Sequence, residues 1–251
     1  HQLVCILHTR CTDETSHRSR VLRCVSAKPE YWDERYGGDH EPFDWLFQFE
    51  HFEKGGFTRF IPKDAKILML GCGNADFSAS LFVSHVFAVE AVLVAHACVF
   101  HGSRYDWGAT NITNIDLSSV VISQMSAANK ASRPHMKYLV MDVQALSFDD
   151  ASFDIVIDKS TMDCLFCCEN STEIVCNMLT EGYRVLKPGG NYISMSLHDE
   201  AKVRGSAVRT VCKHTTERGT LDSPLMMWPT TVPAVPHGAP RHSLEGGVGA
   251  D

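Results

Sequence analysis

The chain has 251 residues, with 44% hydrophobic and 21% charged residues, which is typical of a globular protein with one domain and appendages. Its net charge of -7 argues against nucleic acid as a partner, and its longest apolar stretch, residues 86–100, is shorter than the roughly 20 residues that span a bilayer. Ten irregularly spaced cysteines favour free thiols and a cytoplasmic location over a disulfide framework.

Residues 1–28 are polar and mixed, and we predict a disordered or non-native leader, with a basic targeting arm as the alternative. Two aromatic-rich stretches follow, at 31–36 and 42–46. Their rings either staple an N-terminal helix to the core or form a lid over a bound molecule. Aromatic faces suit a cation such as a sulfonium. The phenylalanines at 47, 49, 52, 57 and 60 predict a helix that leads to Pro62.

An apolar run at 66–70 ends abruptly in Gly71-Cys72-Gly73-Asn74, which predicts a buried strand, a tight turn and a helix over 74–81. Glycines at such a turn let the backbone approach a ligand closely. Two interpretations of the turn are open: an ordinary loop, or part of a site for a nucleotide-like cofactor. The acidic residues later in the chain favour the cofactor site.

A second strand is expected at 112–115, ending in Asp116. An acidic residue at that point commonly lies about 20 residues after the glycine turn, but Asp116 is 45 positions after Gly71. Residues 82–104 are therefore predicted to be surplus: either an additional helix or a gene-model artefact such as translated intron.

The rest of the chain alternates strands and helices, which predicts an α/β fold with a parallel sheet. We expect helices at 118–129 and 173–185, strands at 138–141, 153–157 and 191–196, and a turn at 187–190. Asp116, Asp142 and Asp158 each follow a predicted strand, so the three carboxylates are expected to converge at one sheet edge. Residues 198–251 are rich in Pro, Gly, Thr and His, and predict a low-order tail.

With these pieces in order, residues 29–197 resemble the class I S-adenosylmethionine-dependent methyltransferases. The likeness is greatest to the branch that contains the methyltransferase-like 13 proteins and eukaryotic elongation factor 1A lysine methyltransferase 4. The matching motifs are Tyr31-Trp32-Asp33-x-Arg35-Tyr36, Pro42-Phe43-Asp44-Trp45, Leu70-Gly71-Cys72-Gly73-Asn74, Asn111-Ile112-x-Asn114-Ile115-Asp116, Met141-Asp142-Val143, Asp158-Lys159-x-Thr161-x-Asp163 and Leu186-x-Pro188-Gly189-Gly190.

The resemblance implies a Rossmann-like sheet and S-adenosyl-L-methionine as the cofactor. It also implies a binding role for ten residues. Trp32, Tyr36 and Phe43 would close over the cofactor, and Gly71 and Gly73 would approach its amino acid portion, with Lys159 near the carboxylate. Asp116 would bind the ribose hydroxyls, and Leu117, Asp142 and Val143 would contact the adenine. The family adds a β-hairpin after the fifth strand, which we do not find in the sequence. A missing hairpin would leave the sheet with an open edge.

The implied reaction is methyl transfer to a protein lysine, with elongation factor 1A as the candidate partner. A lysine ammonium must first lose its proton, and we expect Asp158 or Asp163 to orient the acceptor amine. The alternatives are a non-catalytic cofactor-binding module or defective isoform, and a small-molecule methyltransferase. Cys164, Cys167, Cys168 and Cys176 are predicted to be buried helix thiols rather than zinc ligands, because their spacing provides no second ligand pair.

Overall fold

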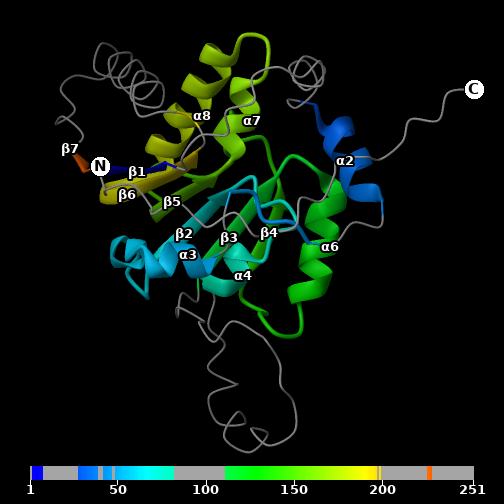
Figure 1. Cartoon of the computed structure of the whole chain (residues 1–251), viewed down its shortest axis with the longest axis horizontal. Helices are drawn as coiled ribbons and strands as arrows, with labels where there is room; N and C mark the ends of the chain where they lie inside the picture. Colours follow the sequence, from blue (N-terminus) through cyan, green and yellow to red (C-terminus); the bar gives the residue numbers. More distant parts are fainter. Residues whose placement is uncertain are drawn as a thin grey trace, which may run out of the picture.

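The protein is an α/β structure in which helices cover both faces of one parallel sheet (Figure 1). This computed structural model describes residues 2–7, 28–38, 42–46, 49–81, 111–196, 198 and 225–227. The strands are β1 (Gln2–Leu7), β2 (Lys66–Leu70), β3 (Asn111–Asp116), β4 (Lys137–Val140), β5 (Phe153–Lys159), β6 (Leu186–Ser196) and β7 (Leu225–Met227). The helices are α2 (Pro29–Gly37), α3 (Phe49–Lys54), α4 (Phe77–Leu81), α6 (Ser119–Asn129), α7 (Thr161–Phe166) and α8 (Ser171–Val185), with a 3-10 turn η1 (Phe57–Phe60).

The strand order is β4-β3-β2-β5-β6-β1-β7, and every pairing is parallel. From β2 the chain moves outward through β3 to β4, and then returns to β5 on the other side of β2. The order therefore reverses between β2 and β5, and in open α/β sheets a ligand binds outside the carboxyl ends of the strands at such a point. The predicted Rossmann-like arrangement of five strands, β2 to β6, is confirmed.

The core consists of two clusters, one on each face of the sheet. Side chains alternate along β2, so Ile67 and Met69 join the cluster with α3, α4 and α6, while Leu68 and Leu70 join the cluster with α7 and α8. Because all four are buried, β2 is covered on both faces, which is why it reads as a continuous apolar run.

The register aligns the carboxyl ends of the central strands. Leu70 at the end of β2 pairs with Ile115 on one side and Asp158 on the other. The predicted sharing of one sheet edge by the ends of β2, β3 and β5 is therefore confirmed, and this edge carries the site described below.

The predictions for the two ends of the chain need correction. Residues 2–7, predicted to belong to a disordered leader, form β1, which pairs with β6 from Gln2↔Asn191 to Leu7↔Ser196. Within the predicted tail, β7 pairs with β1. The backbone groups along the outer edge of β6 need partners, and the run Gln-Leu-Val-Cys-Ile-Leu supplies them. The sheet edge expected to lie open after β6 is thus extended by two strands.

Other boundaries differ for local reasons. The predicted helix before Pro62 is divided into α3 and η1, because Gly56 adopts a left-handed conformation with φ +72°. The predicted turn at 187–190 lies within β6 as an irregularity in its pairing with β5, where Gly189 has φ +81°. The predicted insertion at 82–104, most of the leader and most of the tail lie outside the described residues.

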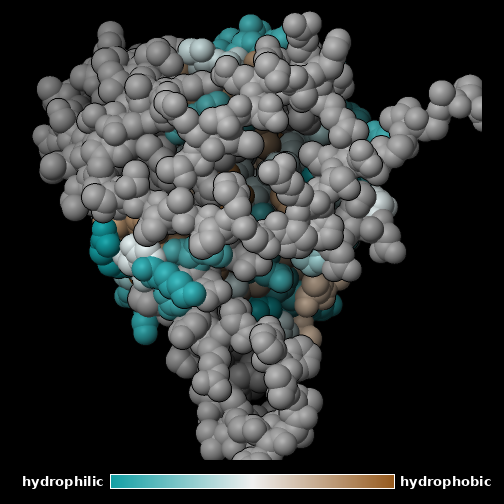
Figure 2. All heavy atoms as spheres, viewed as in Figure 1, coloured by the Kyte–Doolittle hydropathy of each residue, from teal (hydrophilic) through white to brown (hydrophobic). Residues whose placement is uncertain are grey.

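On the face of the molecule in Figure 2, the described surface is largely hydrophilic. Among the described residues, the exposed large apolar side chains are Phe43, Leu139 and Val140. No helix in the described part of the chain is long and apolar enough to cross a membrane.

Candidate functional site

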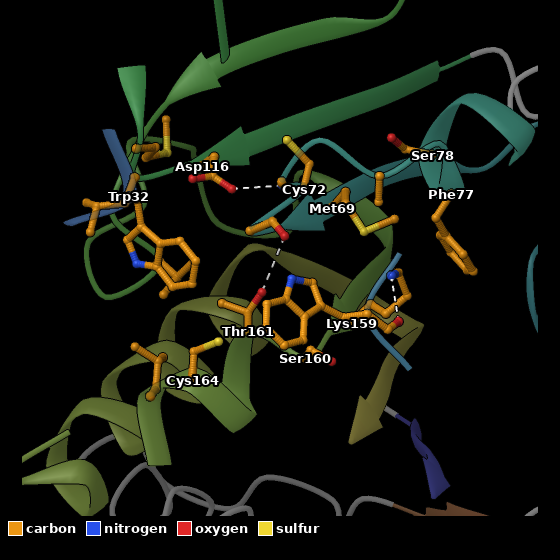
Figure 3. A pocket seen from close by; sticks show the side chains of 18 of the residues that line it. Trp32, Met69, Cys72, Phe77, Ser78, Asp116, Lys159, Ser160, Thr161 and Cys164 are labelled. Atoms are coloured by element: carbon orange, nitrogen blue, oxygen red, sulfur yellow. Dashed lines mark hydrogen bonds between the residues drawn. The ribbon is translucent and has the colours of Figure 1, made fainter. Parts of the chain in front are cut away.

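A pocket of about 900 Å³, measured out to the open solvent at its mouth, lies at the carboxyl ends of β2, β3 and β5. All ten residues predicted to bind the cofactor line it: Trp32, Tyr36, Phe43, Gly71, Gly73, Asp116, Leu117, Asp142, Val143 and Lys159. Figure 3 shows side chains from α2, the strand ends and α7 converging on this space. The structure thus brings the predicted set together, and the cofactor role of each residue stays a prediction.

The glycine turn after β2 forms the floor of the pocket. Gly71 and Gly73 have φ values of +59° and +55°, a conformation that other L-residues rarely adopt. A Cβ at Gly71 would collide with the side chain of Thr161, whose Oγ1 donates to the Leu70 carbonyl at 2.9 Å. A Cβ at Gly73 would lie 3.0 Å from the Tyr36 hydroxyl. Both glycines are therefore required by close packing as well as by the backbone.

Asp116 connects the end of β3 to the glycine turn. Its Oδ2 accepts from the Gly73 N–H at 2.9 Å (Figure 3), and its Oδ1 accepts from the Ser118 N–H at 3.0 Å. Burial raises the pKa of this carboxyl, and the two backbone N–H groups oppose that effect. Because a carboxylate oxygen can accept more than one hydrogen bond, Asp116 can still accept from hydroxyl groups in the pocket.

Helix α2 is held against α6, and this contact places its aromatic rings at the pocket. The Ser118 hydroxyl donates to Asp33 at 2.6 Å and lowers the pKa of that carboxyl, while Gln124 Nε2 donates to the Tyr36 carbonyl at 2.9 Å. Ser118 also caps α6 by accepting from the Val121 N–H. Trp32 stacks on Tyr36 with 5.9 Å between ring centroids. Stacked rings at the wall of a pocket suit a cationic ligand group.

The segment 42–46 lies over the same pocket and is fixed to β5. Lys159 Nζ donates to Asp44 Oδ1 at 3.0 Å and to the Trp45 carbonyl at 2.9 Å (Figure 3). Phe43 is half exposed, and its N–H donates to Asn74 Oδ1 at 3.3 Å. Burial lowers the pKa of Lys159 and raises the pKa of Asp44, whereas their mutual attraction favours the ion pair. Segment 42–46 therefore binds the ammonium of Lys159, a residue that lines the pocket.

The predicted roles of Asp158 and Asp163 need correction, because neither lines the pocket. Asp158 is fully buried, and its two oxygens accept from the Met162 N–H at 3.1 Å and the Ser194 hydroxyl at 3.0 Å. Burial, followed by the charge of Asp163, raises the pKa of Asp158 to about 7. Asp163 accepts from the Ser196 hydroxyl. Asp158 thus connects α7 and β6 to the end of β5.

Several pocket residues were not predicted from the sequence. These are Trp45, Met69, Cys72, Ala75, Phe77, Ser78, Met141, Gln144, Ser160, Thr161, Cys164 and Leu165. Four of them come from the junction of β5 and α7, and α7 has only six residues, too few for helical periodicity to reveal it. Thr161 and Trp45 belong to motifs that were recognised in the sequence, and this membership could have identified them as pocket residues.

The cysteines are only partly as predicted. Cys176 is buried, but Cys164 and Cys168 are half-buried and Cys167 is exposed, because α7 ends there. Across the described ranges, no group of three or more potential ligands could hold a metal ion.

Comparisons with known proteins agree with this geometry. A profile of the family described as "Methyltransferase domain" matches residues 95–194. The chain is 33% identical over 171 residues to the human eEF1A lysine and N-terminal methyltransferase, covering 67% of this chain and 21% of that protein. It is 32% identical over 177 residues to mouse EEF1A lysine methyltransferase 4, covering 66% and 60%. The chain thus spans less than two thirds of these relatives.

Solved structures with a similar arrangement include the PH0226 protein of Pyrococcus horikoshii, at 22% identity and a TM-score of 0.41 over 72% of this chain and 66% of that one. The cyclase SpnF is similar at 15% identity and a TM-score of 0.43 over 75% and 72%.

Residues 95–194 match the family of methyltransferase domains, and the parallel sheet with a pocket at its reversal point is consistent with that class of protein. Within that class, its sequence relatives are the eEF1A lysine methyltransferases, as its motifs predicted.

Proposed function

We propose that the chain transfers a methyl group from S-adenosylmethionine to a lysine side chain of a protein, with elongation factor 1A as the candidate substrate. The observation that carries this proposal is the convergence of ten predicted cofactor residues, from segments far apart in the sequence, on one pocket. The names of the sequence relatives supply the acceptor class.

The residues present fit this cofactor. The glycine turn gives a backbone cradle that a Cβ would obstruct, and Asp116 offers a fixed acidic acceptor at the end of β3. Trp32 and Tyr36 present aromatic faces suited to a sulfonium. Lys159, the proposed partner of the carboxylate, and Asp142 and Val143, the proposed adenine contacts, line the same pocket. When bound, the cofactor supplies an activated methyl group.

The chain's own contribution to the reaction is positioning and the exclusion of water. Direct transfer needs in-line approach of a neutral amine, and holding two reactants in place supplies much of the rate. Phe43 and Trp45 pack edge to face, 5.1 Å apart, at the wall formed by segment 42–46. A desolvated aromatic surface lowers the pKa of a lysine ammonium and so favours its neutral form.

A cytoplasmic location is part of the proposal. Cys72, Cys164, Cys167, Cys168 and Cys176 form no disulfide, as expected in a reducing compartment. The non-catalytic alternative depended on an open sheet edge, and the addition of β1 and β7 weakens that alternative. A small-molecule acceptor has no comparable support.

The test is methyl transfer from isotopically labelled cofactor to purified elongation factor 1A, with the modified residue located by mass spectrometry. We expect label on a lysine, and none with the Asp116→Ala variant. Cofactor binding without transfer to any cytosolic protein would favour the non-catalytic alternative. Labelling confined to small molecules would favour a small-molecule methyltransferase.

A further inference from the structure

Ser160 is a buried pocket residue whose hydroxyl the fold does not use. It follows Lys159 at the carboxyl end of β5, is only 4% exposed and lines the pocket (Figure 3). Its Oγ has no hydrogen-bond partner in the part of the chain that the structure describes. Leaving a buried hydroxyl without a hydrogen bond is unfavourable. Such a group at a pocket wall is a candidate ligand contact.

The backbone of Ser160 is also in an unfavourable conformation. Its φ and ψ are +66° and -2°, a left-handed conformation that is unfavourable for a non-glycine residue. Two hydrogen bonds fix it: its N–H donates to the Met195 carbonyl at 3.0 Å, and its carbonyl accepts from the Cys164 N–H at 3.1 Å. Glycine would meet these backbone demands without strain, so the fold alone gives no reason for a serine here.

Helix capping does not explain the serine either. Ser160 is the residue before α7, and serine is a favoured residue at that position because its hydroxyl usually accepts from the first turn. The Ser160 side chain makes no such bond. The hydroxyl therefore has no partner among the described residues, and the two backbone bonds hold its residue at the pocket.

The adjacent cation indicates which group the hydroxyl would bind. Lys159 lines the same pocket, and its ammonium has three N–H donors, of which Asp44 Oδ1 and the Trp45 carbonyl accept from two. An ammonium and a hydroxyl that both donate form a subsite for a carboxylate. We propose that the Ser160 hydroxyl is a second donor, with Lys159, to the carboxylate of the cofactor's amino acid portion. This inference rests on the proposed function.

The experiment compares Ser160→Ala and Ser160→Gly in the full chain by calorimetric titration with two probes: S-adenosylmethionine and its decarboxylated analogue. Both variants lose the hydroxyl, but only glycine relieves the backbone. We expect both to bind S-adenosylmethionine about tenfold more weakly, as for one lost charge-assisted hydrogen bond, and to bind the decarboxylated analogue as the wild type does. Thermal unfolding reports separately on the fold, and Ser160→Gly should unfold at the same or a higher temperature than Ser160→Ala.

Three results would overturn the inference while leaving the proposed function standing. The first is unchanged affinity of Ser160→Ala for S-adenosylmethionine. The second is an equal loss for both probes, which would assign the effect to pocket shape. The third is wild-type affinity in Ser160→Gly alone, which would make the effect one of backbone strain. A wild-type chain that binds neither probe would overturn the proposed function, and the Ser160 inference with it.

Discussion

Gly71→Ala tests how the glycine turn is built. At φ +59°, the added Cβ costs about 1–2 kcal/mol for the left-handed conformation. It also collides with Thr161, which is β-branched and bonded to the Leu70 carbonyl, so it yields poorly. Overpacking of this kind costs about 1–3 kcal/mol. The free energy of unfolding should therefore fall by about 2–5 kcal/mol, which for a domain of this size lowers the unfolding midpoint by roughly 4–20 °C.

Gly189→Ala is the matched control for that variant. Gly189 has φ +81°, and no atom of the described structure would lie within 4 Å of a Cβ added there, so only the backbone cost of about 1–2 kcal/mol applies. The difference between the two variants in the free energy of unfolding, measured with urea, is the cost of the contact with Thr161. The double variant Gly71→Ala with Thr161→Ala should lose less stability than the sum of the two single variants. If Gly71→Ala is no less stable than Gly189→Ala, the packing explanation of this turn is wrong.

Three further predictions concern acidic residues. Asp116→Ala should abolish calorimetric binding of S-adenosylmethionine, because it removes the fixed acceptor of the pocket, and unchanged affinity would contradict the site assignment. Asp158 has a folded pKa of about 7, above its ordinary value, so the unfolded chain releases this proton first and stability falls as pH rises from about 4 to about 7. Asp158→Asn should flatten the unfolding free energy across that window, and a profile parallel to the wild type would refute the assignment. Asp44→Asn leaves the Lys159 ammonium buried beside a neutral side chain, at a cost of about 3–5 kcal/mol. The double change Asp44→Leu with Lys159→Met should recover most of that loss in urea unfolding, and strictly additive losses would count against the buried pair.

The cofactor pocket was predictable because its residues follow strands that can be recognised one at a time. Apolar runs identify β2, β3 and β5, and a parallel sheet brings the residues at their carboxyl ends to one edge. Asp116 and Lys159 reach the pocket for that reason. Asp158 was expected there on the same grounds, but it is buried beside the pocket, because whether a side chain at a strand end faces ligand or core depends on the elements packed around it.

Contacts between distant segments had no local signature. The pairing of β1 with β6 joins residues almost 190 positions apart, as in Gln2↔Asn191. The six residues of β1 do not by themselves indicate which strand they will pair with. The bond between Asp44 and Lys159 likewise spans 115 positions. Each arises from a geometric fit that periodicity and spacing do not encode.

The sequence by itself therefore determined the class of fold and, through its resemblance to a known family, ten of the residues that line the pocket, because the hydrophobic runs, glycines and strand-end acids that carry both are local features. Only the tertiary structure decided that β1 and β7 extend the sheet, that Asp158 is buried and that the Ser160 hydroxyl lies at the pocket without a partner in the described chain. The physical reason is that burial and hydrogen-bond satisfaction are properties of packed neighbours, and those neighbours are fixed only when the whole sheet is assembled.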